Sequence, residues 1–183
     1  AAGYNCGFVP IDSIHSFTEI MYTIMCGVGM GFSVERQYTN CLGRIPDELF
    51  QSNTTIQVED SRIGWCLAFR ELLSLLYSGQ IPKWDTSQIR PTGARLQTFG
   101  GRASGPKPLE DLFRFTCKIF SDNRGGNLPS LACHDIVCKT GDAVVSGGVR
   151  RSALISLSNL SDDRMRTAKS GEWMNQYRWR ELA

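Results

Sequence analysis

Glycine-rich turns are the first feature of this sequence that could do chemistry. Three of them, at 27–31, 100–105 and 146–148, fall between segments patterned as helices or strands. Glycine lets backbone N–H groups approach a ligand closely, and phosphate is the ligand that such turns favour. None has the P-loop signature, and the turn at 27–31 is wrongly spaced for a dinucleotide fingerprint. Each turn taken singly is therefore also consistent with a tight turn that binds nothing.

Basic and hydroxyl side chains accompany two of these turns. Residues 150–152 (Arg-Arg-Ser) directly follow the third turn, and Arg102 and Ser104 lie within the second. Guanidinium forks and hydroxyls suit phosphate groups and base edges alike. The alternative in each case is a solvated basic turn. The residues alone therefore predict a protein that binds a phosphorylated ligand through several glycine loops.

The cysteines offer a second candidate chemistry. Cys6 lies in a β-rich run, where it is either a small core residue or a redox thiol that faces a pocket. Cys133, His134 and Cys138 cannot build a closed four-ligand zinc site by themselves, so no metal site is predicted. Neither His134 nor His15 has a serine or aspartate partner at a spacing typical of an acyl-transfer triad.

Alternating strand and helix patterns must position these residues. Strands are expected at 4–11, 32–35, 54–58, 94–99 and 153–157, and helices at 14–26, 62–77, 109–120 and 131–145 and from Ser161. The segment 80–93 contains two prolines and is expected to be an irregular surface loop. This order predicts an α/β layered fold.

Composition narrows the class of protein. The 183 residues are 42% hydrophobic and 21% charged, which is typical of a globular domain or part of one. A net charge of +2 provides no broad basic face for nucleic acid, and no apolar stretch is long enough for a membrane span. Seven cysteines, an odd number, indicate a reducing compartment, the cytoplasm. The chain lacks an initial Met and stops within a helical pattern, so we expect a fragment.

Six sequence blocks in one order carry a family resemblance. They are residues 5–9 (NCGFV), 27–34 (GVGMGFSV), 59–65 (EDSRIGW), 89–94 (IRPTGA), 99–106 (FGGRASGP) and 146–153 (SGGVRRSA). With these blocks the chain resembles the adenosylcobalamin-dependent (class II) ribonucleotide reductases, most closely their monomeric ribonucleoside-triphosphate type. The resemblance implies the first half of a ten-stranded α/β barrel, in which a cysteine thiyl radical abstracts the ribose 3′ hydrogen.

The resemblance also implies roles for particular residues. Cys6 would be the first member of the reducing pair, whose partner lies outside the chain. Substrate would be bordered by Asn5, Gly29 and Ser104. The loop between specificity effector and substrate base would consist of Gly147, Gly148, Val149, Arg150, Arg151 and Ser152. Residues 37–97 would be an insertion that supplies the allosteric effector region within one chain.

Cofactor and partners follow from the same resemblance. Adenosylcobalamin, a ribonucleoside triphosphate substrate, a deoxynucleoside triphosphate effector and a thioredoxin-like reductant are expected, with a monomeric complete enzyme. No part of the chain has the Asn-x-Cys-x-Glu pattern of the thiyl cysteine, so we expect this piece alone to be inactive. Two alternatives stay open: a non-catalytic nucleotide-binding regulatory module, and a dimeric class II ribonucleoside-diphosphate reductase.

Overall fold

A β-α-β unit opens the chain. In the computed structural model, which describes residues 5–95, 102–146 and 153–183, β1 (Cys6–Pro10) and β2 (Gly29–Ser33) are parallel and are connected by α1 (Ile14–Met25). A parallel pair needs such a crossover, and a helix usually provides it. Apolar residues at helical spacing form the buried side of α1: Phe17, Ile20, Met21, Ile24 and Met25.

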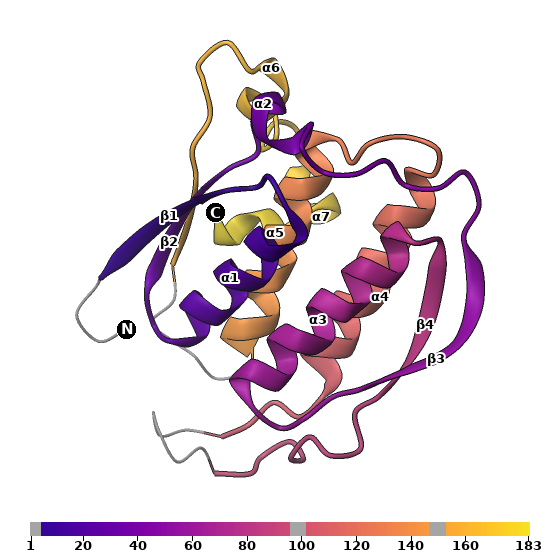
Figure 1. Ribbon diagram of the computed structural model, residues 1–183. Coiled ribbons are helices and arrows are strands. Elements are labelled where there is room, and N and C mark those ends of the chain that lie inside the picture. Colours follow the sequence, from indigo (N-terminus) through magenta and orange to yellow (C-terminus); the bar gives the residue numbers. More distant parts are fainter. Residues whose placement is uncertain (1–4, 96–101, 147–152) are drawn as a thin grey trace.

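A third parallel strand completes this sheet from the far end of the chain. β5 (Leu154–Ser156) pairs with β2, so the strand order is β1-β2-β5. The connection into β5 runs through α5 (Ser130–Ser146), which packs beside α1 on the same side of the sheet (Figure 1). One face of the sheet is therefore covered by helices.

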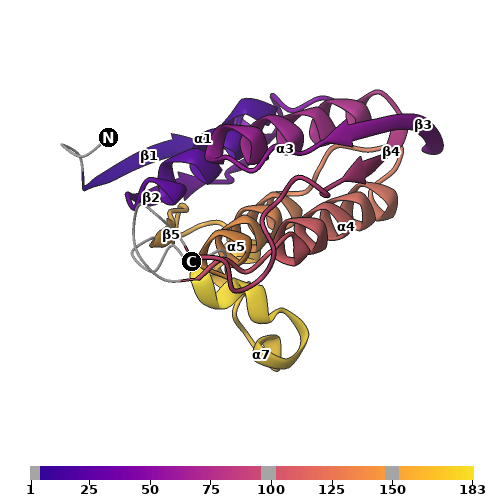
Figure 2. The ribbon, with the colours of Figure 1, turned by 90° about the horizontal axis from the view of Figure 1, so that it is seen from below.

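A second strand-helix-strand unit forms the other half of the molecule. β3 (Phe50–Gln57) and β4 (Gln80–Asp85) make a separate parallel pair, connected by α3 (Arg62–Tyr77). The Ser61 side chain caps α3 by accepting a hydrogen bond from the backbone N–H of Gly64 (2.9 Å). Figure 2 shows β3 and β4 on the opposite side of the helix layer from the sheet β1-β2-β5, with α3 as part of that layer.

Four helices form the shared core between the two sheets. α1 packs on α3, α4 (Lys107–Asp122) packs on α5, and α1 also contacts α5. Aromatic contacts connect α3 with α4, since Phe69 stacks on Phe113 and Tyr77 meets Phe120 edge-on. Shorter helices lie outside this layer: α2 (Arg36–Thr39), α6 (Asp163–Arg166), α7 (Trp173–Gln176) and a 3-10 helix (Arg178–Leu182).

The sequence-based expectations fail at two strands. Residues 80–93 were expected to be an irregular loop, yet β4 occupies 80–85 despite Pro82. Pro82 is tolerated because the β3–β4 register shifts at that point, between the pairs Gln51–Ile81 and Thr55–Lys83. β2 begins within the glycine turn rather than after it. The expected strand at 94–99 lies largely outside the described residues.

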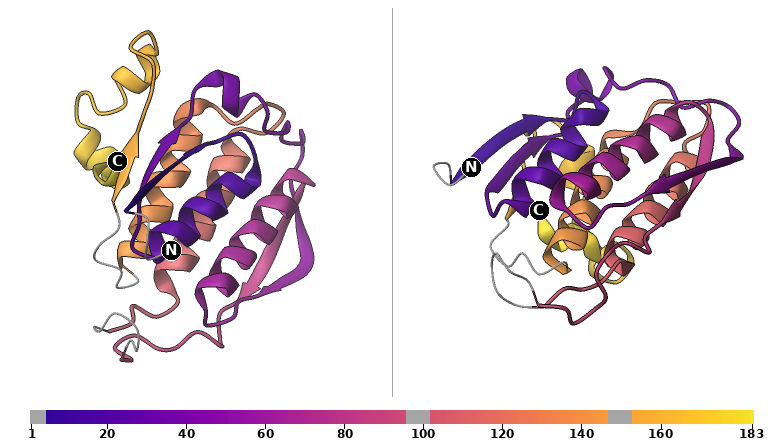
Figure 3. Two further views of the ribbon diagram at one scale, coloured as in Figure 1. Left: turned by 60° about the vertical axis from the view of Figure 1, so that its left-hand side comes forward. Right: turned by 60° about the horizontal axis from the view of Figure 1, so that its bottom comes forward.

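The C-terminal segment is held against α5 by a buried ion pair. Figure 3 shows this segment leaving β5, looping outwards and returning to α5. Arg180 donates to both carboxylate oxygens of Asp135 (2.5 and 2.7 Å) and to the carbonyl of Ala168 (2.8 Å). Both charged side chains are buried, and the Arg180 guanidinium lies over the ring of Tyr177 (3.9 Å). A buried pair with this many hydrogen bonds fixes the segment in one position.

This pair makes stability depend on pH. Burial by itself raises the pKa of Asp135, but hydrogen bonds from Arg180 and His134 and the Arg180 charge outweigh burial and lower it. The carboxylate therefore stabilises the fold above its ordinary pKa, and that stabilisation is lost as the pH falls through the lowered value in the folded chain.

We expect Asp135→Asn to lower the free energy of unfolding by about 3–5 kcal/mol at pH 7, because it leaves a buried arginine without its counter-charge. Urea denaturation at several pH values measures this, and the difference from the unaltered chain should shrink in acid. Asp122→Asn, which removes an exposed ion pair with Lys118, is the matched control and should change the free energy of unfolding by no more than about 0.5 kcal/mol. Equal effects of the two substitutions would contradict this account.

Candidate functional site

Three strands bring Cys6, Gly29 and Ala153 into one row at their amino ends. Cys6 pairs with Gly29, whose backbone N–H donates to the carbonyl of Asn5 (3.0 Å). On the other side of β2, the backbone N–H of Met30 donates to the carbonyl of Ala153 (2.8 Å). A Cβ atom added at Gly29 would lie 3.6 Å from the Asn5 carbonyl oxygen and 4.0 Å from the Ala153 Cβ. These are ordinary van der Waals distances, so the neighbouring strands do not crowd position 29.

The pleat gives the sheet two different faces. Met30 and Phe32 of β2 are buried on the side of α1 and α5, and Phe32 contacts the His134 ring of α5. The residues that alternate with them, Gly29 and Gly31, therefore face the opposite side. None of the helices in the described part of the chain covers the sheet there, and we call this side the open face.

Two apolar side chains flank the glycines on the open face. A Cβ atom at Gly31 would lie 3.4 Å from Phe8 and 3.6 Å from Ile155, so both side chains lean over this position. Phe8 is 52% exposed and Ile155 is 56% exposed. The Cys6 side chain is also exposed. On the open face, the exposed Cys6 thiol therefore lies at one end beside Gly29, and the Phe8 and Ile155 side chains cover Gly31 at the other.

Phe8 and Ile155 were missed by the sequence reasoning. The available signal was the alternation of buried Met30 and Phe32 with glycines, which predicts that neighbouring strands place their own side chains over those glycines. The sequence-based prediction treated the glycines at 27–31 only as a turn, and so it missed the strand alternation that continues through them.

Ser104 lies in a loop that is hydrogen-bonded to residues 92 and 93. Its carbonyl accepts a hydrogen bond from the Thr92 hydroxyl (2.8 Å), and Arg102 donates to the carbonyl of Gly93 (3.0 Å). Gly105 has a φ of +75°, and a Cβ there would lie 2.5 Å from the Thr92 hydroxyl, so only glycine fits. Within the described part of the chain, no hydrogen bond connects this loop with Cys6 or Gly29. Gly100 and Gly101 lie outside that part.

The predicted specificity loop, residues 147–152, also lies outside the described residues. Its position in the chain is nevertheless bounded on both sides, by Ser146 at the end of α5 and by Ala153 in the row with Gly29. The residue that follows the loop is therefore two strands away from Cys6, about 10 Å at the usual strand spacing.

Cys138 and His134 form a buried cluster rather than a reactive site. The Cys138 sulfur lies 3.6 Å from the Nδ1 atom of His134, which is itself 3.6 Å from the Asp135 carboxylate. Burial first, and then the negative charge of Asp135, raise the pKa of Cys138 to about 12. The thiol is thus protonated and shielded. Over the described ranges, no group of three or more His, Cys, Asp or Glu residues could hold a metal ion.

Comparison with known proteins identifies the family. Residues 36–120 match the sequence profile described as "B12-dependent ribonucleotide reductase, insertion domain". The adenosylcobalamin-dependent ribonucleoside-triphosphate reductase of Lactobacillus leichmannii is 31% identical over 89% of this chain and 27% of its own length. Its namesake in Euglena gracilis is 33% identical over 85% of this chain and 22% of its own length. The chain belongs to the B12-dependent ribonucleotide reductase family.

A solved structure of the family has the same fold. The crystal structure of a B12-dependent (class II) ribonucleotide reductase superposes with a TM-score of 0.83 at 24% identity, covering 97% of this chain and 32% of that one. The predicted family and the predicted α/β class, as part of the reductase fold, are confirmed. The chain spans about a quarter of the length of its reductase relatives. The boundaries 37–97 of the effector insertion stay a prediction.

No helix within residues 5–95, 102–146 and 153–183 is both long and apolar enough to cross a membrane.

Alkylation at neutral pH should separate the exposed thiols from the buried ones. Cys6 and Cys41 are exposed and should react with iodoacetamide in the folded chain. Cys138 should react roughly three orders of magnitude more slowly than an ordinary thiol, because a pKa of about 12 in place of 9.0 reduces the thiolate fraction by that factor. Peptide mass spectrometry after timed quenching measures the rates. A Cys6 as slow as Cys138 would contradict an open face.

Proposed function

We propose that this chain is part of an adenosylcobalamin-dependent ribonucleoside-triphosphate reductase, and that its open face is one wall of the substrate site. The observation that carries the proposal is the row of Cys6, Gly29 and Ala153, which places an exposed thiol beside bare backbone. A glycine floor lets the sugar of a nucleotide approach the strands closely. The relatives that are named ribonucleoside-triphosphate reductases support the choice of substrate.

Cys6 is the first of two reducing thiols in this proposal. Cys6 and a second cysteine, outside this chain, each give up one hydrogen. The 2′ hydroxyl of the ribonucleotide leaves as water, the 2′ carbon takes up hydrogen in its place, and the two sulfurs end as a disulfide. A thioredoxin-like dithiol then reduces that disulfide for the next turnover. The exposure of Cys6 supports this role, because the reductant and the substrate both need access to the sulfur.

The other predicted residues complete the substrate and specificity sites of the proposal. Asn5 and Gly29 border the substrate beside Cys6, and Ser104 contributes from the loop after residue 101. Residues 147–152 relate the bound deoxynucleotide effector to the substrate base, which is a coupling between two sites through one segment. The entry of this segment into β5 at Ala153, next to Gly29, supports that assignment. Residues 37–97 supply the effector region, so that a monomer in the cytoplasm needs no second subunit for it.

Adenosylcobalamin does not fit the residues described here. By the alternation of the strands, the described side chains of the open face are Cys6, Phe8, Pro10, Ser33, Ala153 and Ile155, and they include neither a histidine nor a carboxylate to hold the cofactor. His15 lies on the outer side of α1, and His134 is buried between Phe32 and Cys138. We propose that the cofactor and the thiyl cysteine are held by parts of the reductase beyond these 183 residues.

In the complete reductase, we expect Cys6→Ser to retain 3′-hydrogen abstraction but to lose turnover. Serine cannot give up the hydrogen that Cys6 supplies or form the disulfide, so deoxynucleotide should not be formed, even in a first turnover. Release of label from 3′-tritiated substrate measures the first step, and deoxynucleotide yield measures the second.

Cys41→Ser, which alters an exposed cysteine at the end of α2, is the matched control and should behave as the unaltered enzyme. Unchanged multiple turnover in Cys6→Ser would overturn the role given to Cys6. Ribonucleotide reduction without adenosylcobalamin would overturn the proposed activity itself.

A further inference from the structure

A second pair of cysteines lies where α1 ends and α3 begins. Cys26 follows the last residue of α1 and is partly exposed, and Cys66 lies in the second turn of α3 and is 9% exposed. The guanidinium of Arg62, the first residue of α3, approaches the Cys26 sulfur at 3.8 Å. The end of α1 and the first turn of α3 are therefore in direct contact.

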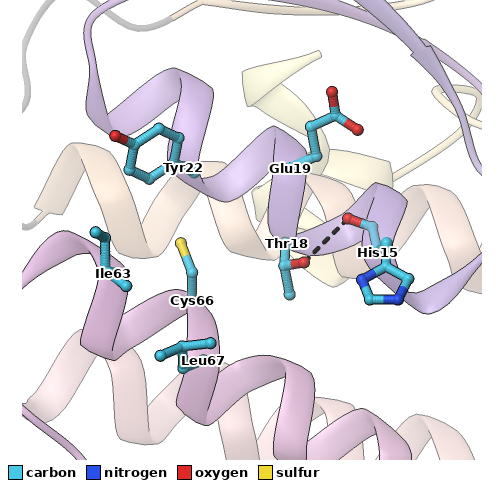
Figure 4. Close-up of a pocket in the computed structure, with 7 residues that line it drawn as sticks. All are labelled: His15, Thr18, Glu19, Tyr22, Ile63, Cys66 and Leu67. Carbon is cyan, nitrogen blue, oxygen red and sulfur yellow. Dashed lines mark hydrogen bonds between the residues drawn. The ribbon is translucent and has the colours of Figure 1, made fainter.

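Helix geometry places the two thiols on facing surfaces. Arg62 and Cys66 are four residues apart and lie on the same side of α3, as Tyr22 and Cys26 do along α1. The two helices pack side by side and run in opposite directions (Figure 1). Tyr22 and Cys66 line one groove of about 330 Å³ between the helices, and Figure 4 shows the Cys66 sulfur directed towards α1. Cys26 and Cys66 therefore occupy adjoining turns of one helix contact.

The surroundings give the two thiols different accessibility. Burial, and after it the proximity of Cys26, raise the pKa of Cys66 to about 12, so this thiol remains protonated at neutral pH. Cys26 is the more exposed of the two thiols, so a small oxidant reaches it first. Cys66 is the resolving thiol, and because it starts protonated we expect it to attack slowly, during a long exposure to the oxidant.

We propose that Cys26 and Cys66 form an oxidation-sensitive pair that is distinct from the reducing pair of Cys6. Hydrogen peroxide, the oxidant class in this proposal, oxidises the Cys26 thiol to a sulfenic acid and is reduced to water. The Cys66 sulfur then attacks the Cys26 sulfur, a second water leaves, and a disulfide connects α1 to α3. A dithiol reverses the reaction.

The position of the bond gives it a consequence for the site. Gly27, with a φ of +82°, turns the chain from Cys26 into β2, which begins at Gly29 beside Cys6. α3 lies within the segment that matches the insertion domain. The disulfide would therefore fasten the insertion to the turn that leads into the substrate-facing strand.

Peptide mapping of the 183-residue chain tests this inference. After exposure to hydrogen peroxide and alkylation of the remaining thiols, digestion with trypsin and Glu-C gives peptides 20–35 and 63–70, which contain Cys26 and Cys66 as their only cysteines. We expect these two peptides to be recovered as one disulfide-linked species, with the loss of two hydrogen atoms, and to separate after treatment with dithiothreitol.

Variants decide the assignment. Cys26→Ser and Cys66→Ser should each abolish the linked species, whereas Cys6→Ser and Cys41→Ser should leave its yield unchanged. Recovery of the Cys26 and Cys66 peptides as two separate species after exposure to peroxide, with Cys66 still a free thiol and no trapping reagent present, would overturn the proposal. A dominant bond from either cysteine to Cys6 would overturn it as well. None of these outcomes depends on reductase activity, so the result stands apart from the proposed function.

Discussion

The rest of this structure depends on the difference between the two faces of one three-stranded parallel sheet. Alternate residues of β2 are large and apolar on one side and are glycines on the other, so the helices can pack on only one face. Parallel sheets are normally covered on both faces, and their outer strands are normally paired. Here the uncovered face carries the exposed Cys6 thiol and two exposed apolar side chains. That combination makes the open face the place where chemistry and further polypeptide meet.

The helix layer connects the open face with the remainder of the chain. α1 covers the sheet on one side and packs on α3 on the other, and α5 connects α4 with β5. The buried Asp135–Arg180 pair holds the C-terminal segment on α5, next to His134, whose ring contacts Phe32 of β2. A displacement of α3 would therefore be transmitted to the strands of this sheet through α1, and a displacement of α5 would act on β5 directly, with no long loop between them. This arrangement suits a reductase in which an effector region must influence a substrate site.

Local patterns predicted much of this fold, and the failures have physical reasons. The spacing of Phe17, Ile20 and Ile24 predicted α1, and Ser61 predicted the start of α3, because helix periodicity and capping are local properties. β4 was missed because Pro82 breaks the strand pattern, and only the shifted register of its partner makes it acceptable. The Asp135–Arg180 pair joins residues 45 positions apart, and spacing along the chain carries no signal for it.

The candidate site was predictable in part. From spacing alone, Cys6 could be either a core residue or a redox thiol, because an isolated cysteine in a strand has no local pattern typical of either role. Only the family resemblance favoured the redox thiol. Phe8 and Ile155 required the register of three strands, which the chain order alone does not fix.

A crystal structure of the complete reductase with a ribonucleotide and a deoxynucleotide effector tests the central claim most directly. The account predicts the ribose over Gly29, with the Cys6 sulfur facing its 2′ carbon and residues 150–151 against the base of the same nucleotide. A ribonucleotide bound away from the open face, with Cys6 and residues 150–151 on separate surfaces, would contradict it.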